Sequence, residues 1–266
     1  MFDDPLFLRL QRGLEPTRRA LALEQRVREL VADLAMLVDA PRTFDPSAST
    51  RLFRISAPEF VSVTVGSRVF KALLDLAPAC RLQIVHLSDD EAREQLRRSS
   101  LDLAIGRFVS AEGSPFKRQH FYDDEFCVVA RQGNVLAPQR MSAAAYQRLV
   151  HVFAEADSEI SRNDSSTDMD GLKFMVVPHW LTALAIVADS DFIATCPRRL
   201  AESQKDTLGL KIYPLPFEAE QIRVSMLTLQ DSRDPATKWL SELLQTSVDQ
   251  AAVKVSAPRA KKRIRL

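Results

Sequence analysis

Glycine is scarce in this 266-residue chain, and its glycines are widely spaced. Phosphate-binding loops of the GxGxxG and P-loop types, and the GxSxG turn that presents a nucleophilic serine, need glycines about two to five residues apart. No two glycines here are closer than seven residues. The spacing therefore excludes these nucleotide-binding loops and the α/β-hydrolase nucleophile. The glycines are Gly13, Gly66, Gly106, Gly113, Gly133, Gly171 and Gly209.

Cysteine and histidine are also few and dispersed. The cysteines are Cys80, Cys127 and Cys196, and the histidines are His86, His120, His151 and His179. An odd number of distant cysteines provides neither a disulfide framework nor a CxxC zinc site, so each is expected to be a small buried hydrophobe. The histidine spacing excludes an HExxH helix, and a structural role is expected for each histidine. We expect no metal, no cofactor and no enzyme activity, because Ser, His and carboxylate residues show no catalytic spacing.

A large net charge and a long apolar run are both missing. The formal net charge is +1, which gives no support for a chain that coats nucleic acid or membrane by bulk charge. The first five residues form neither the basic nor the apolar part of a signal peptide. The longest nearly apolar stretch, Trp180 to Ala188, is far shorter than the roughly 18 residues of a membrane-spanning helix. We expect a soluble, cytoplasmic protein without a membrane partner.

The N-terminal segment predicts a small hairpin that leads into a helix. Pro5 to Arg9 forms an extended arm, Gly13 suits a turn that needs positive φ, and Leu14 to Pro16 is the return arm. Thr17 is placed to cap the following helix with its hydroxyl oxygen. A hairpin this small is not stable alone, so it needs a core to pack against.

The helix predicted from Thr17 to Val38 carries one apolar seam with alternating spacings of three and four. The seam consists of Ala20, Leu23, Val27, Leu30, Leu34 and Leu37. It is shorter than the three to four heptads, roughly, that identify a coiled coil, so the pattern alone also fits an amphipathic helix lying on its own domain. Residues 41–50, rich in Pro, Ser, Thr and Asp, are predicted to be a linker.

From Arg51 the pattern changes to alternating strands and helices. "RLFRISA", "RLQIVHL" and "LDLAIG" are predicted strands, separated by a helix from Glu59 to Leu76 and by a helix that Ser88 and Glu91 begin as a capping box. This order is typical of a parallel sheet with right-handed crossovers.

A second α/β segment follows with a less regular pattern. Its predicted strands are "FCVVA", "LVHVFA", "LKFMVV", "DFIAT", "LKIYPL" and "IRVSMLTL". His179 to Ala188 is apolar on nearly every face and predicts a buried helix. Two further helices are predicted to begin at Pro197 and at Asp234-Pro235. The final "VKVSAPRAKKRIRL" is interpreted as a solvated basic tail, and a role in contacting phosphates stays open. Two α/β lobes without a catalytic motif favour a binding protein, whose ligand lies beyond the carboxyl ends of the strands.

Five segments together resemble the LysR-type transcriptional regulators. "DPLFLRLQRGLEPTRRALAL" resembles the wing and the start of the linker helix of their winged helix-turn-helix domain. The segments that resemble successive parts of their effector-binding domain are "FDPSASTRLFRISAPEF", "LDLAIGRF", "VVPHWLTALAIVADSDFIATCPRRLAE" and "SRDPATKWLSELL". The match runs from about Asp3 to about Leu244, and the ordered set is specific, although no single segment would be.

The resemblance implies an α/β fold with a two-lobe, periplasmic-binding-protein-like effector domain. The implied domains are a wing remnant at 1–16, a linker and dimerisation helix at 17–40, a linker at 41–50, the effector-binding domain at 51–248 and a basic disordered tail at 249–266. Lobe I would comprise 51–125 and 223–248, and lobe II 129–215. The chain would cross near Cys127 to Arg131 and return near Leu215 to Val224.

Members of the family place a helix-turn-helix before the wing, whereas Met1 falls where the last helix before the wing should end. We favour a late-assigned start over a natural truncation, because the hairpin has no use without the core that it packs on. Without a recognition helix, the chain as given is expected not to bind DNA sequence-specifically. Weak, salt-sensitive contacts with backbone phosphates are expected from Arg9, Arg12, Arg18 and Arg19.

The resemblance implies a ligand-responsive bacterial transcription regulator. Its partners would be a small organic effector, DNA in the full-length form, and further copies of the chain in a homodimer or homotetramer that pairs through the linker-helix seam. The alternative is a free-standing small-molecule binding protein, or a decoy subunit without DNA binding.

The effector is expected just past the strand ends of the two lobes. The expected residues are Ser56, Pro58, Glu59, Phe60, Gly106, Arg107 and Phe108 in lobe I, and Phe153, Pro178, His179 and Thr195 in lobe II. Arg107 suits a carboxylate, and Glu59 opposes a purely anionic ligand. The three phenylalanines favour an aromatic or amphipathic molecule with one polar end. The alternative for Arg107 is a surface ion pair with Glu59.

Overall fold

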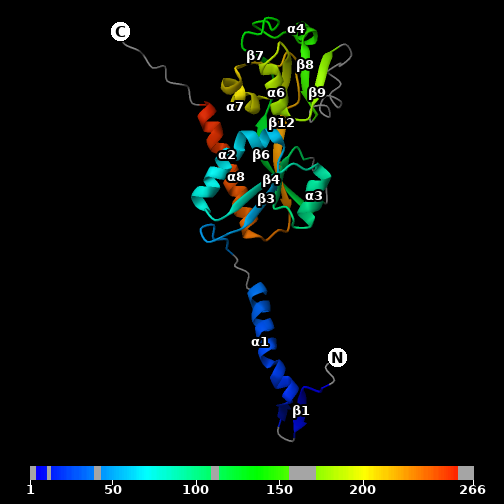
Figure 1. Ribbon diagram of the computed structural model, residues 1–266, viewed down its shortest axis with the longest axis vertical. Helices are drawn as coiled ribbons and strands as arrows, with labels where there is room; N and C mark the ends of the chain where they lie inside the picture. Colours follow the sequence, from blue (N-terminus) through cyan, green and yellow to red (C-terminus); the bar gives the residue numbers. More distant parts are fainter. Residues whose placement is uncertain (1–3, 11–12, 39–42, 109–113, 156–171, 257–266) are drawn as a thin grey trace, which may run out of the picture. The chain divides into compact units, whose positions relative to one another are not determined.

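The computed structural model describes residues 4–10, 13–38, 43–108, 114–155 and 172–256 and divides into two compact units, Met1–Phe44 and Asp45–Leu266. The first unit holds the predicted hairpin and helix (Figure 1). Strands β1 (Phe7–Leu10) and β2 (Gly13–Pro16) pair antiparallel, and α1 spans Arg18–Val38. Gly13 has φ +123°, which confirms that the turn uses the conformational freedom of glycine.

Thr17 joins the hairpin to the helix. The N–H of Ala20 donates to Thr17 Oγ1 at 3.2 Å, which confirms the predicted cap. The Thr17 hydroxyl donates in turn to Asp4 Oδ1 at 2.8 Å, and the same oxygen accepts the N–H of Leu6 at 2.7 Å. The start of α1 and the arm before β1 are therefore held by one carboxylate.

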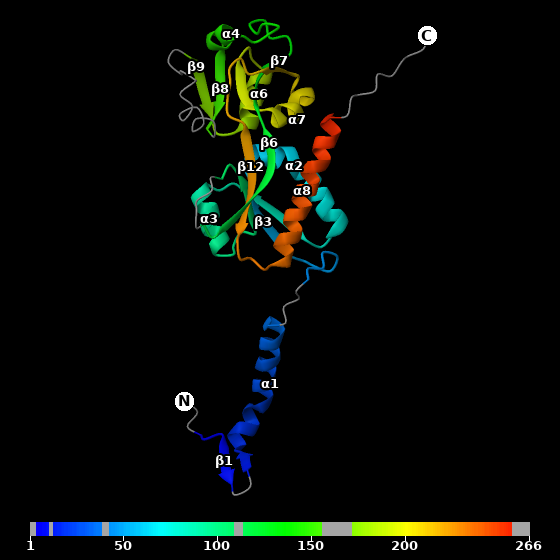
Figure 2. The same ribbon diagram turned by 180° about the vertical axis from the view of Figure 1, so that it is seen from behind.

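The second unit contains two five-stranded sheets, one in each lobe (Figures 1 and 2). In lobe I the strand order is β4-β3-β5-β12-β6. The lobe I strands are β3 (Leu52–Ser56), β4 (Arg81–Val85), β5 (Leu103–Gly106), β6 (Phe116–Asp124) and β12 (Ile222–Leu229). Its helices are α2 (Glu59–Leu76), α3 (Asp89–Arg97) and α8 (Pro235–Ser256). In both views α2 and α8 lie on one face of this sheet and α3 on the other.

The first three strands of lobe I form the expected parallel sheet, because β3 pairs parallel with both β4 and β5. The capping box that begins α3 is confirmed: Ser88 Oγ accepts the N–H of Glu91 at 3.4 Å, and Glu91 Oε2 accepts the N–H of Ser88 at 3.0 Å. Helix α2 buries one side with an apolar residue at every fourth position, and these residues are Val61, Val65, Val69 and Leu73.

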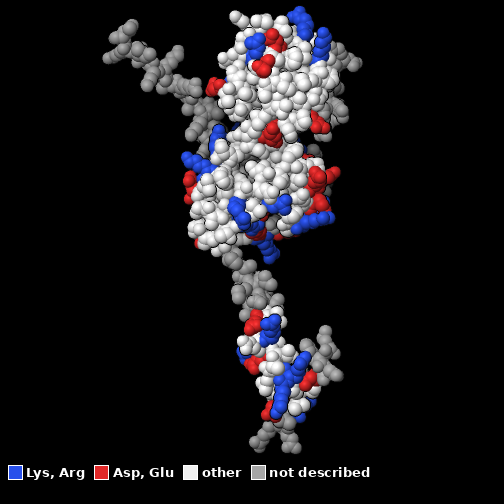
Figure 3. Space-filling view, viewed as in Figure 1, with Lys and Arg blue, Asp and Glu red and all other residues white. Residues whose placement is uncertain are grey.

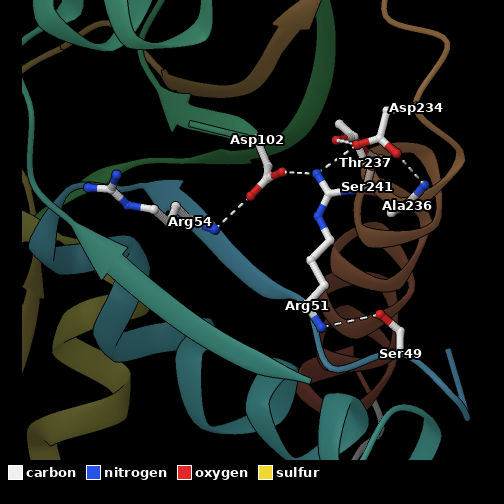
Figure 4. A network of polar contacts seen from close by, with 8 residues as sticks. All are labelled: Ser49, Arg51, Arg54, Asp102, Asp234, Ala236, Thr237 and Ser241. Carbon is white, nitrogen blue, oxygen red and sulfur yellow. Dashed lines mark hydrogen bonds and ion pairs between the residues drawn. The ribbon is translucent and has the colours of Figure 1, made fainter. Parts of the chain in front are cut away.

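Arg51 ties the start of β3 to the start of α8 in lobe I (Figure 4). Its guanidinium bonds Asp102, in the turn before β5, and lies 2.7 Å from Asp234 Oδ2. Asp234 also accepts the N–H of Ala236 at 3.0 Å and the hydroxyl of Thr237 at 2.9 Å, which confirms the predicted helix start. One arginine therefore connects three segments that are distant in sequence.

In lobe II the strand order is β11-β7-β10-β8-β9. The strands are β7 (Phe126–Arg131), β8 (Val150–Ala154), β9 (Lys173–Val177), β10 (Ile193–Pro197) and β11 (Leu210–Pro214), and the helices are α4 (Ala143–Arg148), α6 (Trp180–Ala188) and α7 (Arg198–Leu208). Helix α6 was expected to be buried on nearly every face, but Thr182 and Ala185 are exposed. It buries one face only, because it covers a sheet from outside; that face consists of Trp180, Ala183, Leu184 and Val187.

Several elements differ from the sequence-based expectations. Strand β6 and helix α4 were not predicted; the middle of β6 is polar and exposed, because β6 is an edge strand, so it lacks the apolar pattern of a buried strand. The chain crosses between lobes at Glu125, slightly before the expected segment, and returns through residues 215–221. Helix α8 continues to Ser256, into the expected tail, because no proline or glycine lies between Pro235 and Pro258. Residues 257–266 lie outside the described part.

Both lobes carry charges of both signs on the face shown in Figure 3. Of the helices that the structure describes, none has the length and apolar character to cross a membrane.

Candidate functional site

The lobe I residues of the expected site gather at the carboxyl edge of its sheet. Ser56, the last residue of β3, is buried and pairs with Ala104 of β5, so Gly106 and Arg107 follow at the same edge. Pro58 stands at the N-cap of α2 and offers no side-chain cap. Parallel pairing thus brings the segments after β3 and β5 together, although about fifty residues separate them in sequence.

Glu59 connects this edge to lobe II. Its Oε2 accepts the N–H of Leu181, in the first turn of α6, at 3.1 Å. His179 is the N-cap residue of α6 and makes no side-chain cap, and both His179 and Pro178 are exposed. The start of α6, with Pro178 and His179, therefore lies beside the start of α2, and the two helix starts share one carboxylate.

Arg107 does not pair with Glu59. Its guanidinium lies 3.9 Å from Glu220 in the segment that returns from lobe II, and the Glu220 side chain is 88% exposed. An ion pair this long and exposed holds Arg107 weakly, worth under about 1 kcal/mol. The guanidinium can therefore exchange this partner for a ligand group without a large loss of stability.

The phenylalanines of the expected site are buried. Phe108 lies in the core of lobe I with Leu101 and Leu227, and its ring is 3.2 Å from the position of a Cβ on Gly106. Phe153 stacks on His151 in lobe II, with ring centroids 5.4 Å apart. Phe60 is buried in the first turn of α2. Burial of large aromatic surface favours these positions, so Phe108 and Phe153 contribute to the lobe interiors.

Thr195 lies inside β10, where its hydroxyl pairs with the hydroxyl of Tyr146 at 2.9 Å. Tyr146 also contacts His151: the ring nitrogen Nε2 of His151 lies 2.8 Å from the Tyr146 carbonyl oxygen and donates to it. Burial lowers the pKa of His151, which favours the neutral ring. Thr195 is thus part of a polar cluster within lobe II.

Sequence reasoning missed a second polar contact between the lobes. Asp124, the last residue of β6, accepts the N–H of Arg199 in the first turn of α7 at 3.3 Å, and it accepts the N–H of Glu125 at 2.9 Å. The Arg199 guanidinium lies 4.4 Å from the centre of the Tyr122 ring. Burial raises the pKa of Asp124. The sequence gives no local signal for this contact, because β6 was not predicted and Asp124 and Arg199 are 75 residues apart.

No metal site accompanies these groups: in the described ranges, no three His, Cys, Asp or Glu side chains are arranged to hold an ion. The junction can instead bind a polar organic group through backbone N–H groups at two helix starts, the Ser56 hydroxyl and the Arg107 guanidinium.

The expected DNA-contact and pairing residues belong to the first unit. Arg9, Arg18 and Arg19 are exposed, whereas Arg12 is outside the described residues. In the seam, Val27 and Leu30 are 52% and 59% exposed, and Ala20 and Leu23 are partly exposed. The side chains of Leu34 and Leu37 are outside the described part. Exposed leucine and valine at seam spacing leave an apolar stripe along α1.

The comparisons with known proteins agree with this architecture. Residues 47–249 match the family model of the LysR substrate binding domain. The transcriptional activator NagR of Ralstonia sp. is 28% identical over 250 residues, which cover 90% of this chain and 81% of NagR. Nodulation protein D 1 of Sinorhizobium fredii is 30% identical over 250 residues, which cover 91% of this chain and 76% of that protein.

Solved structures share the fold. The crystal structure of a probable transcriptional regulator of Pseudomonas aeruginosa superimposes with a TM-score of 0.68 at 24% identity, covering 92% of this chain and 82% of that one. The family match spans both lobes and most of the chain. The chain therefore belongs to the LysR family: it is a LysR-type transcription regulator with an effector-binding domain formed by two α/β lobes.

Proposed function

We propose that this regulator responds to a small organic effector that binds at the junction of its two lobes. The observation that carries the proposal is the convergence of Ser56 and Arg107 in lobe I with the start of α6 in lobe II, beside the Glu59 contact with Leu181. Ligands of open α/β sheets bind beyond the carboxyl ends of the strands, and both lobes present that edge here.

The chemistry of the junction favours an effector with at least one polar end. Arg107 can donate two parallel hydrogen bonds to a carboxylate, because Glu220 holds it weakly. The start of α6 adds backbone donors. Phe108 and Phe153 pack in the lobe interiors, so their rings give no support for an aromatic effector.

The first unit would supply the other functions of a regulator. Pairing of α1 along the seam would join two chains into a homodimer, or two such pairs into a tetramer, and the full-length form would bind DNA. The exposed apolar residues of the seam support the pairing, because they would otherwise stay in water. Arg9, Arg18 and Arg19 are exposed and would reach backbone phosphates.

A melting-temperature screen tests the effector proposal. The purified chain is heated with a library of small organic acids, alcohols and amines, and an effector is expected to raise the melting temperature by selective binding to the folded state. In Arg107→Ala the rise is expected to disappear, while the melting temperature without ligand stays nearly unchanged.

Arg68→Ala is the matched control, because Arg68 is an exposed arginine on α2 away from the carboxyl edge of the sheet. It should keep the full ligand response. An unaltered response in Arg107→Ala, for any effector that the screen finds, would remove Arg107 from the site.

A further inference from the structure

Two helices of lobe II begin at the junction without a capping side chain of their own. His179 is the N-cap residue of α6 and Pro197 that of α7, and neither side chain accepts a hydrogen bond from its helix. The first N–H groups of a helix have no partner within it, and the helix dipole favours a negative charge beside them. The first N–H groups of both helices are therefore open to water or to acceptors from elsewhere in the chain.

Lobe I supplies a carboxylate to each of these helices. Glu59 accepts the N–H of Leu181 in α6 at 3.1 Å, and Asp124 accepts the N–H of Arg199 in α7 at 3.3 Å. In both cases the acceptor lies in one lobe and the helix in the other. Two carboxylate caps therefore join the lobes, in addition to the segments that cross between them. In both ribbon views α2, which begins with Glu59, lies at the junction next to α6 and α7 (Figures 1 and 2).

The two caps lie at different distances from the crossing segments. Asp124 directly precedes Glu125, where the chain passes from β6 to β7. Glu59 follows β3, and β5 separates β3 from the crossing strand β12, so β3 and β12 lie about 10 Å apart across the sheet. Rotation of the lobes about the crossings would leave Asp124 beside α7 and would pull Glu59 away from α6.

We propose that Glu59 is a releasable latch between the lobes, whereas Asp124 is a permanent cap at the hinge. With Glu59 on the start of α6 the junction is held shut; when Glu59 leaves, lobe II rotates away and the start of α6 becomes available. The inference deepens the proposed function, because the latch controls access to the same junction. The hydrogen bond between Glu59 and Leu181 forms and breaks without a bound effector.

A second role for Glu59 has to be separated from the latch. An acidic residue in the first turn also stabilises its own helix, here α2. Glu59→Gln removes the charge from both roles. Glu59→Asp keeps the charge at the start of α2 but is one methylene too short to reach Leu181 across the junction. The aspartate variant therefore distinguishes the two roles.

The test measures the distance between the lobes by spin-label spectroscopy on the whole chain without added ligand. Labels are attached at Lys71→Cys on α2 and Gln147→Cys on α4, which are exposed positions, while the native cysteines are buried. Labelled chain is diluted with unlabelled chain so that only distances within one chain are observed. Loss of the hydrogen bond from Leu181 to a carboxylate is expected to raise the ratio of open to closed lobes about five- to thirtyfold in Glu59→Asp. A smaller rise is expected in Glu59→Gln, because its amide oxygen can still accept the N–H of Leu181 but carries no charge.

Glu220→Gln is the matched control, because it removes the charge of an exposed carboxylate that pairs with Arg107 of lobe I; it should leave the distances unchanged. The latch is overturned if Glu59→Asp behaves like the parent chain, if neither Glu59 variant shifts the distances, or if Glu220→Gln shifts them equally. A failed effector screen would leave these distances as they are, so the latch and the effector proposal fail separately.

Discussion

Arg51 and Asp234 form an ion pair at 2.7 Å that joins the first strand of lobe I to its last helix. The same guanidinium bonds Asp102, whose other oxygen accepts the N–H of Arg54 at 2.7 Å (Figure 4). Hydrogen bonds from Arg51, Ala236 and Thr237 outweigh the opposing effect of burial and lower the pKa of Asp234. The linker residues directly precede this network, so Arg51 fixes where the first strand of lobe I begins.

Arg51→Met is expected to destabilise the second unit by about 2 kcal/mol. Methionine keeps the apolar part of the arginine side chain, but Asp102 and Asp234 lose the charged donor that they share. Urea unfolding followed by circular dichroism measures the loss. Arg51→Lys should lie between the parent and the methionine variant, since one ammonium cannot present the same planar donors to both acids. Equal stability of the methionine variant and the parent would show that the network contributes nothing.

Asp124 should lower the free energy of unfolding as the pH rises, whereas an ordinary salt-bridged acid raises it. Its pKa is raised by burial, so the folded chain holds this proton at pH values where the unfolded chain has lost it. The parent should therefore lose stability relative to Asp124→Asn as pH rises from 3.8, the ordinary aspartate value, through the higher folded pKa. Urea unfolding of both proteins from pH 4 to pH 8, roughly, measures the difference.

The control for this comparison is Asp124→Ala, which cannot cap α7. It should be less stable than Asp124→Asn by about 1 kcal/mol at every pH, because the N–H of Arg199 loses its acceptor. If the stability of the parent relative to Asp124→Asn instead rose with pH, the pKa of Asp124 would be lowered in the folded chain, contrary to the effect of its burial.

Leu30→Glu should weaken the pairing of chains through α1. Leu30 is exposed in the single chain, and a glutamate there would be buried without a partner in the proposed seam. The dissociation constant measured by analytical ultracentrifugation should rise at least about a hundredfold. Leu21→Glu provides the same chemical change at a similarly exposed leucine beside the seam and should have a much smaller effect. Equal effects of the two variants would argue against the seam.

Most elements could be predicted because their signals are local. The two residues of the capping box, Ser88 and Glu91, are three positions apart, and the apolar residues on the buried side of α2 repeat every four. Asp124 and Glu59 could not be assigned as caps, because the helices that they cap are 75 and 122 residues away. The direction of a side chain also could not be predicted. The residues near Phe108 in the sequence do not indicate whether its ring points toward the junction or into the core of lobe I. The ring lies in the core, because burial of its apolar surface is favourable there.

Amide hydrogen exchange, with and without an effector from the melting screen, tests most directly whether the effector binds between the lobes. Bound effector should slow exchange together in residues 56–60 and 106–108 of lobe I and in residues 178–182 of lobe II, because backbone groups of both lobes would contact it or be enclosed by it. Protection of both lobes at the junction is the predicted result. Protection confined to one lobe, or located only outside these segments, would contradict binding between the lobes.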